Sequence, residues 1–462
     1  MPPIHLFHGG LISPVSIHEA QYLERALLAV SSEGVIEWIE HDVDPTLIQD
    51  VALKHGLELD SSVEIYELKH GEWLMPGFVD THTHAPQFPN IGIGGQYELL
   101  KWLENVTFPT ESRFSDLEFA RSVYTTVIDR VLSFGTTTCC YYGTLHLEAT
   151  KLLADIISQK GQRAFVGKCN MNRESPSYQE ASSEQSVADT QTLISYIRSL
   201  SPSNPLVHPI LTPRFAISCT SELLKALGKI AQSDPTLAIQ THISENKSEI
   251  AYTLELFKNY PGCTSYAGVY KEHGLLSDRT ILAHAVHLTE EELNMVKECE
   301  AGVSHCPTSN FYLNSGVCKV GDMLDRGIKV GLGTDCSGGF SPSIINAVRD
   351  AVIASKVIAM SSPSSDTSAL ANRTLPLATL LHLSTLGGAQ LCNLSTEIGS
   401  LEPGKQFDAI LVNVRGEAGN GSVWAGEKDS LSVMLEKFFM GGDDRNIRRV
   451  WVRGRLVSGV DA

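Results

Sequence analysis

The feature that most constrains the fold is a series of eight apolar runs of strand length, most of them followed by a segment with helical spacing, such as 117–135 and 221–232. Alternation of this kind predicts parallel strands joined by helical crossovers. The runs lie at residues 78–84, 135–143, 163–170, 205–213, 237–244, 280–286, 301–307 and 329–335. Eight strand–helix units in roughly 250 residues predict an α/β fold, the (β/α)8 TIM barrel.

Both ends of the chain differ from this pattern. Short β-rich pieces occur at 34–43 and 62–77 near one end and at 397–414 and 446–459 near the other. We expect these pieces to pair as antiparallel strands in a small β-sandwich satellite domain built from both termini. The predicted domains are therefore a composite β-sandwich of 1–76 and 397–462 and a barrel of 77–396.

Charge and cysteine usage restrict the partners and the compartment. The 462 residues carry a formal net charge of -17, which argues against nucleic acid or an anionic membrane as a partner. No segment reaches the ~20 apolar residues of a transmembrane helix, and residues 1–14 do not resemble a signal peptide. Ten scattered cysteines without a CxxC pair predict reduced thiols and a cytoplasmic location.

The first predicted barrel strand ends in the sequence HTH, with His82 and His84 one residue apart. Side chains alternate along a strand, so both imidazoles would point the same way, about 6–7 Å apart. Such a pair suggests a metal site if other ligands converge on it. A lone HxH motif is equally compatible with two surface histidines at a strand end.

Other predicted strands also end in polar residues, and barrel enzymes place their active sites at the carboxyl ends of the strands. His242 ends the fifth run, His284 lies in the sixth, His305 in the seventh and Asp335 ends the eighth. Each residue alone could be an ordinary core side chain. Five strand ends bearing His or Asp together predict one functional site.

Neutral imidazoles with one carboxylate suit a borderline divalent metal such as zinc or iron. We expect the ligands to be His82, His84, His242 and Asp335, with room for a water whose pKa would fall to about 7. Glu245, three residues after a ligand, is placed to shuttle a proton, and His284 to aim the water. Asp335 would share in the proton transfer. This set predicts hydrolytic attack on an electron-poor carbon.

A second metal would need a bridging carboxylate, often a carbamylated lysine on a barrel strand. Lys168 is the one lysine on an interior-looking strand, and an ion pair is the better explanation for it. Arg214, at the end of the fourth run, cannot become such a ligand because it stays protonated. The sequence favours one metal.

Several motifs extend this hypothesis by resemblance. PGFVDTHTHAPQ, THISEN, LAHAVHL, SHCPTSN and GLGTDCSGG resemble the amidohydrolase superfamily. HTHAPQF, WLENVTFPTE, LTPRFAISC and FFMGGDDRNIRRVWVRGRLV resemble the guanine deaminases within it, in order along the whole chain. The resemblance implies a barrel enzyme of purine catabolism or salvage that converts guanine and water to xanthine and ammonia at C2. It also implies one Zn2+ per subunit, with Fe2+ as an alternative, and a homodimer.

The same resemblance assigns residues to roles. The metal ligands fall on the four residues named above, the proton shuttle on Glu245 and the water-orienting histidine on His284, with His287 as a second candidate. The purine contacts fall on Gln87, Arg214 and Phe215, and we expect His84 and His242 to face the substrate as well.

Two other functions remain open. The first is another amidohydrolase-type deaminase or chlorohydrolase acting on a different aminated heterocycle, which would not need the set Gln87, Arg214 and Phe215. The second is a non-catalytic scaffold relative, which metal analysis would distinguish from an enzyme. A cytidine-type deaminase is disfavoured because the H-x-E…P-C-x-x-C signature is absent.

Overall fold

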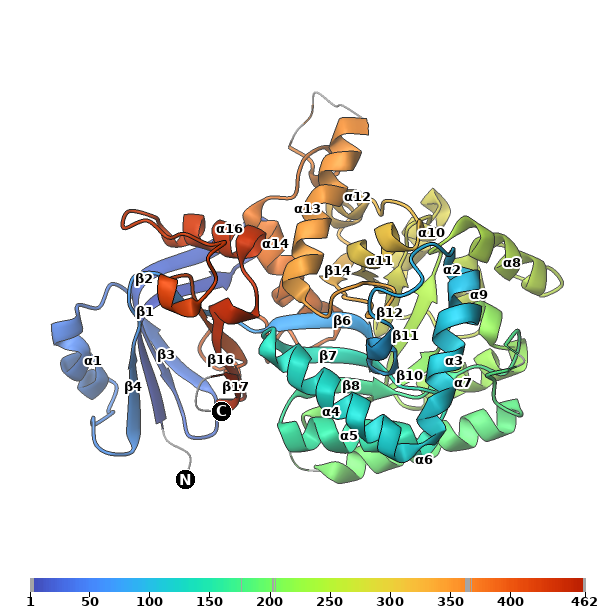
Figure 1. The fold of residues 1–462 in the computed structure, drawn as a ribbon, viewed down its shortest axis with the longest axis horizontal. Helices are drawn as coiled ribbons and strands as arrows, with labels where there is room; N and C mark the ends of the chain where they lie inside the picture. Colours follow the sequence, from blue (N-terminus) through green and yellow to red (C-terminus); the bar gives the residue numbers. More distant parts are fainter. Residues whose placement is uncertain are drawn as a thin grey trace.

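The computed structural model describes residues 4–175, 177–201, 203, 205–361, 366 and 368–459. A barrel of parallel strands stands beside a second sheet, and strands from both ends of the chain form this second sheet (Figure 1). Within the described ranges, no helix combines the length and apolar character that crossing a membrane requires.

The barrel contains all eight predicted strands, each inside its predicted run. They are β6 (Phe78–His84), β7 (Thr136–Tyr142), β8 (Arg163–Gly167), β10 (Val207–Pro213), β11 (Ala238–Ile243), β12 (Thr280–His284), β13 (Gly302–His305) and β14 (Lys329–Leu332). A short extra strand, β9 (Cys169–Asn170), pairs with β10. Most of these residues are buried, and burial on both faces explains why the runs lack a regular alternation of apolar and polar residues.

Neighbouring strands pair in parallel from β6 round to β14. Hydrogen bonds bridge the gap between the last and first strands. The Thr81 hydroxyl donates to the Leu332 carbonyl at 2.9 Å, and the Asp335 N–H donates to the His82 carbonyl at 2.8 Å. The predicted barrel is therefore confirmed.

Helices cover the outside of the barrel (Figure 1). They are α4 (Leu117–Ser133), α5 (Leu147–Lys160), α6 (Ser183–Leu200), α7 (Ser221–Ser233), α8 (Lys247–Phe257), α9 (Tyr266–Glu272), α10 (Glu290–Glu298), α11 (Pro307–Tyr312), α12 (Val320–Asp325), α13 (Ile344–Ser361), α14 (Leu377–Ser384) and α15 (Leu386–Leu391). The helices predicted at 117–135 and 221–232 are α4 and α7. Their N-caps, Asp116 and Thr220, accept backbone N–H bonds from the first turn.

The second sheet joins the two ends of the chain. Its strands are β1 (Ile4–Pro14), β2 (Ala20–Val30), β3 (Ile36–Glu40), β4 (Val63–Glu67), β5 (Glu72–Pro76), β15 (Ala409–Asn413), β16 (Ile447–Val452) and β17 (Arg455–Gly459). Antiparallel pairing of β5 with β15 connects the halves, while β4 and β5 run parallel to β1. Phe7, Leu28, Ala409 and Trp451 belong to one buried cluster, so strands from both ends of the chain share a core.

Several short helices lie outside these two sets of elements. α1 (Ile48–Lys54) and α16 (Leu431–Gly441) accompany the second sheet. Between β6 and α4 the chain forms the 3-10 helix η2 (Ala85–Asn90), α2 (Leu99–Trp102), the π-helix η3 (Leu103–Thr107) and α3 (Phe108–Glu111). This last segment lies next to the site described below.

A buried ion pair fastens the barrel to the second sheet. Arg163, at the start of β8, is fully buried and donates through Nε and Nη2 to Asp408 at 2.9 and 3.2 Å. Asp408 immediately precedes β15. The two parts of the protein are thus joined by charge as well as by chain connection.

Replacing Arg163 by alanine is expected to lower the free energy of unfolding by ~3–5 kcal/mol, because Asp408 would be left as an uncompensated buried charge. Urea unfolding measures this effect. Arg25→Ala is the matched control, since Arg25 pairs with Asp42 on the surface at 3.2 Å and an exposed pair contributes only ~0–1 kcal/mol. Equal losses in the two variants would contradict the tethering role of Arg163.

Candidate metal centre and active site

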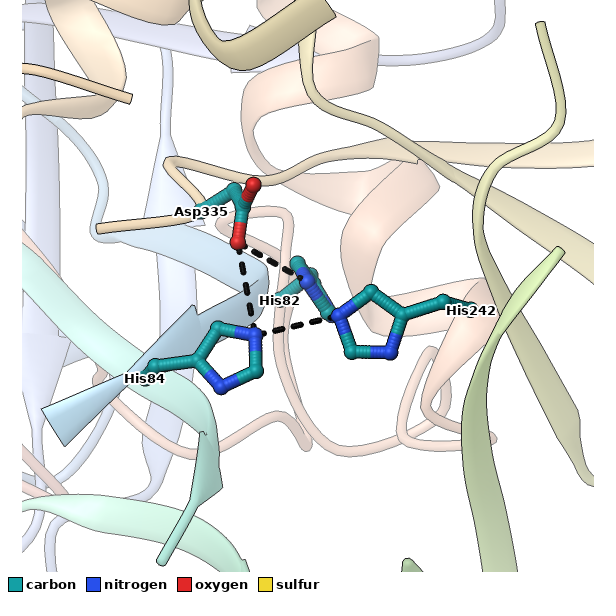
Figure 2. Close-up of side chains that lie close together, drawn as sticks. All are labelled: His82, His84, His242 and Asp335. Carbon is teal, nitrogen blue, oxygen red and sulfur yellow. Dashed lines mark hydrogen bonds and ion pairs between the residues drawn. The ribbon is translucent and has the colours of Figure 1, made fainter. Parts of the chain in front are cut away.

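Four side chains from distant parts of the chain meet at the carboxyl end of the barrel (Figure 2). His82 and His84 come from β6, His242 from β11, and Asp335 from the loop after β14. His82 Nε2 lies 3.1 Å from Asp335 Oδ1, and His84 Nε2 lies 3.4 Å from the same oxygen. His84 Nε2 and His242 Nε2 are 3.1 Å apart. Their ligand atoms therefore surround one point.

The spacing fits a tetrahedral metal ion. Zinc–nitrogen bonds of about 2.0–2.1 Å place neighbouring ligand atoms of a tetrahedron roughly 3.3 Å apart, close to the distances seen. His242 Nδ1 donates to the Arg214 carbonyl at 2.6 Å, which leaves the Nε2 lone pair directed at the cluster. This arrangement of donors can hold one divalent cation.

The protonation states suit ligation. Burial, reinforced by the neighbouring histidines, holds the pKa of His84 and of His242 well below the usual value, so both stay neutral. Burial opposes ionisation of Asp335, but the hydrogen bond from His82 and the adjacent histidines outweigh it and lower the pKa of Asp335. Neutral imidazoles and an ionised carboxylate are the forms that bind a metal.

Backbone geometry explains how the loop ligand reaches this point. Asp335 has a φ of 43°, in the left-handed region, which non-glycine residues rarely adopt. Its backbone N–H donates a hydrogen bond to the His82 carbonyl at 2.8 Å. The loop therefore turns sharply after β14 and presents the carboxylate to the β6 histidines.

Glu245 and His284 form a second pair beside the cluster. His284 Nδ1 donates to the Asn310 side-chain oxygen at 3.0 Å, so its Nε2 is free to face Glu245 Oε2 at 3.5 Å and Asp335 Oδ2 at 3.8 Å. Burial raises the pKa of Glu245 to about 7, which lets this carboxyl gain and lose a proton near neutrality. The Ser315 hydroxyl donates to its other oxygen at 3.2 Å.

Polar groups of a different kind also line this region. Gln87 and Arg214 are almost fully buried, and both bond to the carboxylate of Glu111. Burial disfavours the charged guanidinium, but Glu111 outweighs burial and raises the pKa of Arg214. Phe215, the next residue, begins the turn after β10.

These side chains line one cavity with about 370 Å³ of empty space, part of it open to solvent. Its reactive groups are His84, His242, Glu245, His284 and Asp335, and its recognition groups are Gln87 and Arg214. Apolar walls complete the enclosure, formed by Leu99, Trp102, Leu103, Phe215 and Leu313. A small planar molecule with a polar edge would fit among these groups.

A profile of the Amidohydrolase family matches residues 73–457 of the sequence, which include the whole barrel. The chain belongs to the amidohydrolase family. Its relatives include a probable guanine deaminase of Schizosaccharomyces pombe, 45% identical over 99% of this chain and 84% of the relative. A guanine deaminase of Dictyostelium discoideum is 42% identical over 98% of both chains.

Solved structures of amidohydrolases agree with this fold. A guanine deaminase from C. acetobutylicum, crystallised with guanine in its active site, superposes with a TM-score of 0.86 at 31% identity. The match covers 98% of this chain and 100% of that one. The barrel and the second sheet of this amidohydrolase are therefore shared with that enzyme.

Three residues weighed from the sequence lie outside the cavity of this amidohydrolase. His305, at the end of β13, instead lines a separate cavity near α12 and α13. Lys168 forms an ion pair with buried Glu180, in line with its simpler reading. His287 contacts the Ser315 carbonyl through Nε2 at 2.7 Å. Four of the five predicted strand ends therefore converge on the cavity, and the end of β13 does not.

The sequence reading missed several groups that shape the site. The sequence analysis does not predict Glu111 and Asn310 as site residues, although they lie in the motifs WLENVTFPTE and SHCPTSN. A charged residue closing the otherwise uncharged stretch VTFPTE was the only signal for Glu111. The sequence gives no signal for Leu99, Trp102, Leu103 and Leu313, because apolar residues in short helices and at their ends do not show which cavity they line.

Proposed function

We propose that this amidohydrolase is a guanine deaminase, which hydrolyses the C2 amino group of guanine to give xanthine and ammonia. The observation that carries the proposal is one cavity lined both by hydrolytic groups and by the hydrogen-bonding groups of Gln87 and Arg214. Full-length relatives with this activity support it.

Recognition of guanine rests on three residues. Arg214 offers a fork of N–H donors that suits the O6 carbonyl, and Gln87 offers an amide that both donates and accepts. Phe215, at the cavity wall, stacks on the purine ring or offers its backbone groups. His84 and His242, among the reactive groups, also face the substrate.

The resident metal is proposed to be one Zn2+, held by His82, His84, His242 and Asp335, with Fe2+ as the alternative. When bound, such an ion supplies Lewis-acid activation of water. Cys306 also lies within 4.8 Å of His82 and His284 ligand atoms, but burial raises the pKa of its thiol well above the usual value. A protonated thiol is a poor ligand, which supports a single ion.

The remaining steps are proton transfers by this chain's own groups. Glu245 takes a proton from the attacking water and gives it to a ring nitrogen of guanine, which makes C2 more electrophilic. His284 Nε2 orients the water and the oxygen it delivers to C2. Asp335 and Glu245 then carry the proton of the new C2 hydroxyl to the departing amine, so that ammonia leaves and the carbonyl of xanthine remains.

The test is an ultraviolet assay that follows the deamination of guanine, adenine and cytosine side by side. We expect xanthine from guanine and no comparable turnover of the other bases. Adenine carries an amine where Arg214 needs an acceptor, and an unpaired buried polar group costs ~1–3 kcal/mol. Turnover of a different aminated heterocycle but not of guanine would instead favour the alternative deaminase or chlorohydrolase.

Further proposals concern assembly and location. We propose a homodimer, with residues 1–76 and 397–462 as one domain and 77–396 as the other. We also propose that the protein works in the cytoplasm. All ten cysteines lie in the described part of the chain and are free, which suits a reducing compartment.

A further inference from the structure

The two proposed recognition residues share a third partner, Glu111. Arg214 Nη1 donates to Glu111 Oε2 at 2.7 Å, and Arg214 Nη2 donates to Oε1 at 3.0 Å. Gln87 Nε2 donates to the same Oε1 at 2.9 Å. Glu111 has no solvent exposure. One enclosed carboxylate therefore fixes both side chains at once.

This contact determines which way the Gln87 amide points. Its nitrogen must face the Glu111 carboxylate, which only accepts, and its oxygen accepts from the Ser337 backbone N–H at 3.3 Å. One N–H and one lone pair of the amide then remain for a ligand. A flipped amide would set oxygen against oxygen, so Glu111 fixes the hydrogen-bonding pattern offered to the substrate.

The same carboxylate balances the charge of the pocket. Arg214 is only 2% exposed, and a buried cation without a counter-charge is costly. With Glu111 in place, the pair is neutral overall and the guanidinium can donate to an uncharged carbonyl. Without it, a net positive charge would face the cavity and attract anions.

Glu111 also links the recognition residues to the cavity wall. It ends α3, which continues from η3 and α2, and these elements supply Leu99, Trp102 and Leu103 to the cavity. The ring of Phe108, on α3, lies 5.3 Å from the Arg214 guanidinium carbon. Loss of the Glu111 carboxylate would therefore disturb both the orientation of the Gln87 and Arg214 donors and the position of the apolar cavity wall.

We propose that Glu111 is a positioning and specificity-determining residue, which orients Gln87 and Arg214 and makes the cavity selective for neutral over anionic purines. This inference rests on the proposed guanine deaminase function. Glu111 acts through its two partners and not on the reacting atoms.

The test variant is Glu111→Gln, which keeps the shape and removes the charge. We expect KM for guanine to rise by about 10-fold or more with a smaller change in kcat, since guanine binding depends on the two donors that Glu111 orients. We also expect inhibition by urate, an anion at neutral pH, to strengthen about 10-fold relative to inhibition by neutral hypoxanthine. A merely loosened site would bind both inhibitors more weakly.

Three variants complete the experiment. Glu104→Gln is the matched control, because Glu104 lies in the same segment but is exposed and pairs with Lys101 at 2.9 Å. Glu111→Asp keeps the charge and should keep the wild-type inhibitor ratio. The double variant, Glu111→Gln with Arg214→Gln, lacks both charges, so it should not show the strengthened inhibition by urate. This measurement can be made even if the single variant does not fold.

The outcomes separate the two proposals. Wild-type protein that releases no ammonia from guanine would overturn the proposed function. Active wild-type protein whose E111Q variant keeps the wild-type KM and inhibitor ratio would overturn the role of Glu111 alone. A urate preference that persists in the double variant would also overturn it, because the preference would not come from Arg214.

Discussion

Glu245→Gln is expected to lower kcat by about 10²–10⁴-fold, the usual contribution of a positioned acid–base group. The carboxyl lies 3.5 Å from His284 Nε2, lines the cavity, and has a pKa raised to about 7 by burial. Glutamine keeps the size and the bond from Ser315 but cannot carry a proton between water and purine. KM should change far less than kcat, because the recognition residues are untouched.

Single-turnover kinetics and metal analysis check this prediction. Metal content should match that of the wild type, since Glu245 is not among the four clustered ligands. Glu255→Gln is the control, because Glu255 is exposed on the helix that follows and pairs with Lys258. Full turnover by Glu245→Gln would refute the proton role.

Removing the metal is expected to produce the second large effect. Loss of several kcal/mol of transition-state stabilisation corresponds to a fall in kcat/KM of about 10²-fold or more. Thermal stability should also fall, because three imidazoles and a carboxylate would remain packed together without a cation. A ligand present at about 1,000 times its Kd stabilises the native state by ~4 kcal/mol.

Dialysis against a chelator, followed by zinc or iron, tests both the requirement and the identity of the metal. Activity and Tm should return with the native ion in the wild type. They should not return in His82→Ala, which lacks one of the clustered ligands. Undiminished activity of metal-free protein would contradict the proposed metal centre.

Much of the barrel follows from local sequence pattern. Each strand is buried on both faces, so each one appears as a short apolar run, and helices with clear caps such as Asp116 separate them. The convergence of His82, His242 and Asp335 follows from topology, because parallel strands bring their carboxyl ends together. The sequence therefore predicts which segments form the barrel strands and at which end of them the candidate site lies.

Other features depend on contacts that no local pattern records. The sequence pieces singled out near the N-terminus omit β1 and β2, the longest strands of the second sheet. β1 contains Gly9 and Gly10 at a bulge, which interrupt the strand pattern. His305 ends a barrel strand but faces a different cavity. Glu111 matters only because folding places it against Gln87 and Arg214, residues 24 and 103 positions away.

The pairing of β5 with β15 has a consequence for biosynthesis. Leu74 of β5 pairs with Leu411 of β15, so β5 is synthesised more than 330 residues before its partner strand. At translation rates of about 5–20 residues per second, this interval is of the order of tens of seconds. During that time, the edge of β5 that β15 later covers is exposed on the ribosome, together with its apolar residues such as Leu74. The nascent chain is expected to need holdase chaperones there until its last strands emerge and cover them.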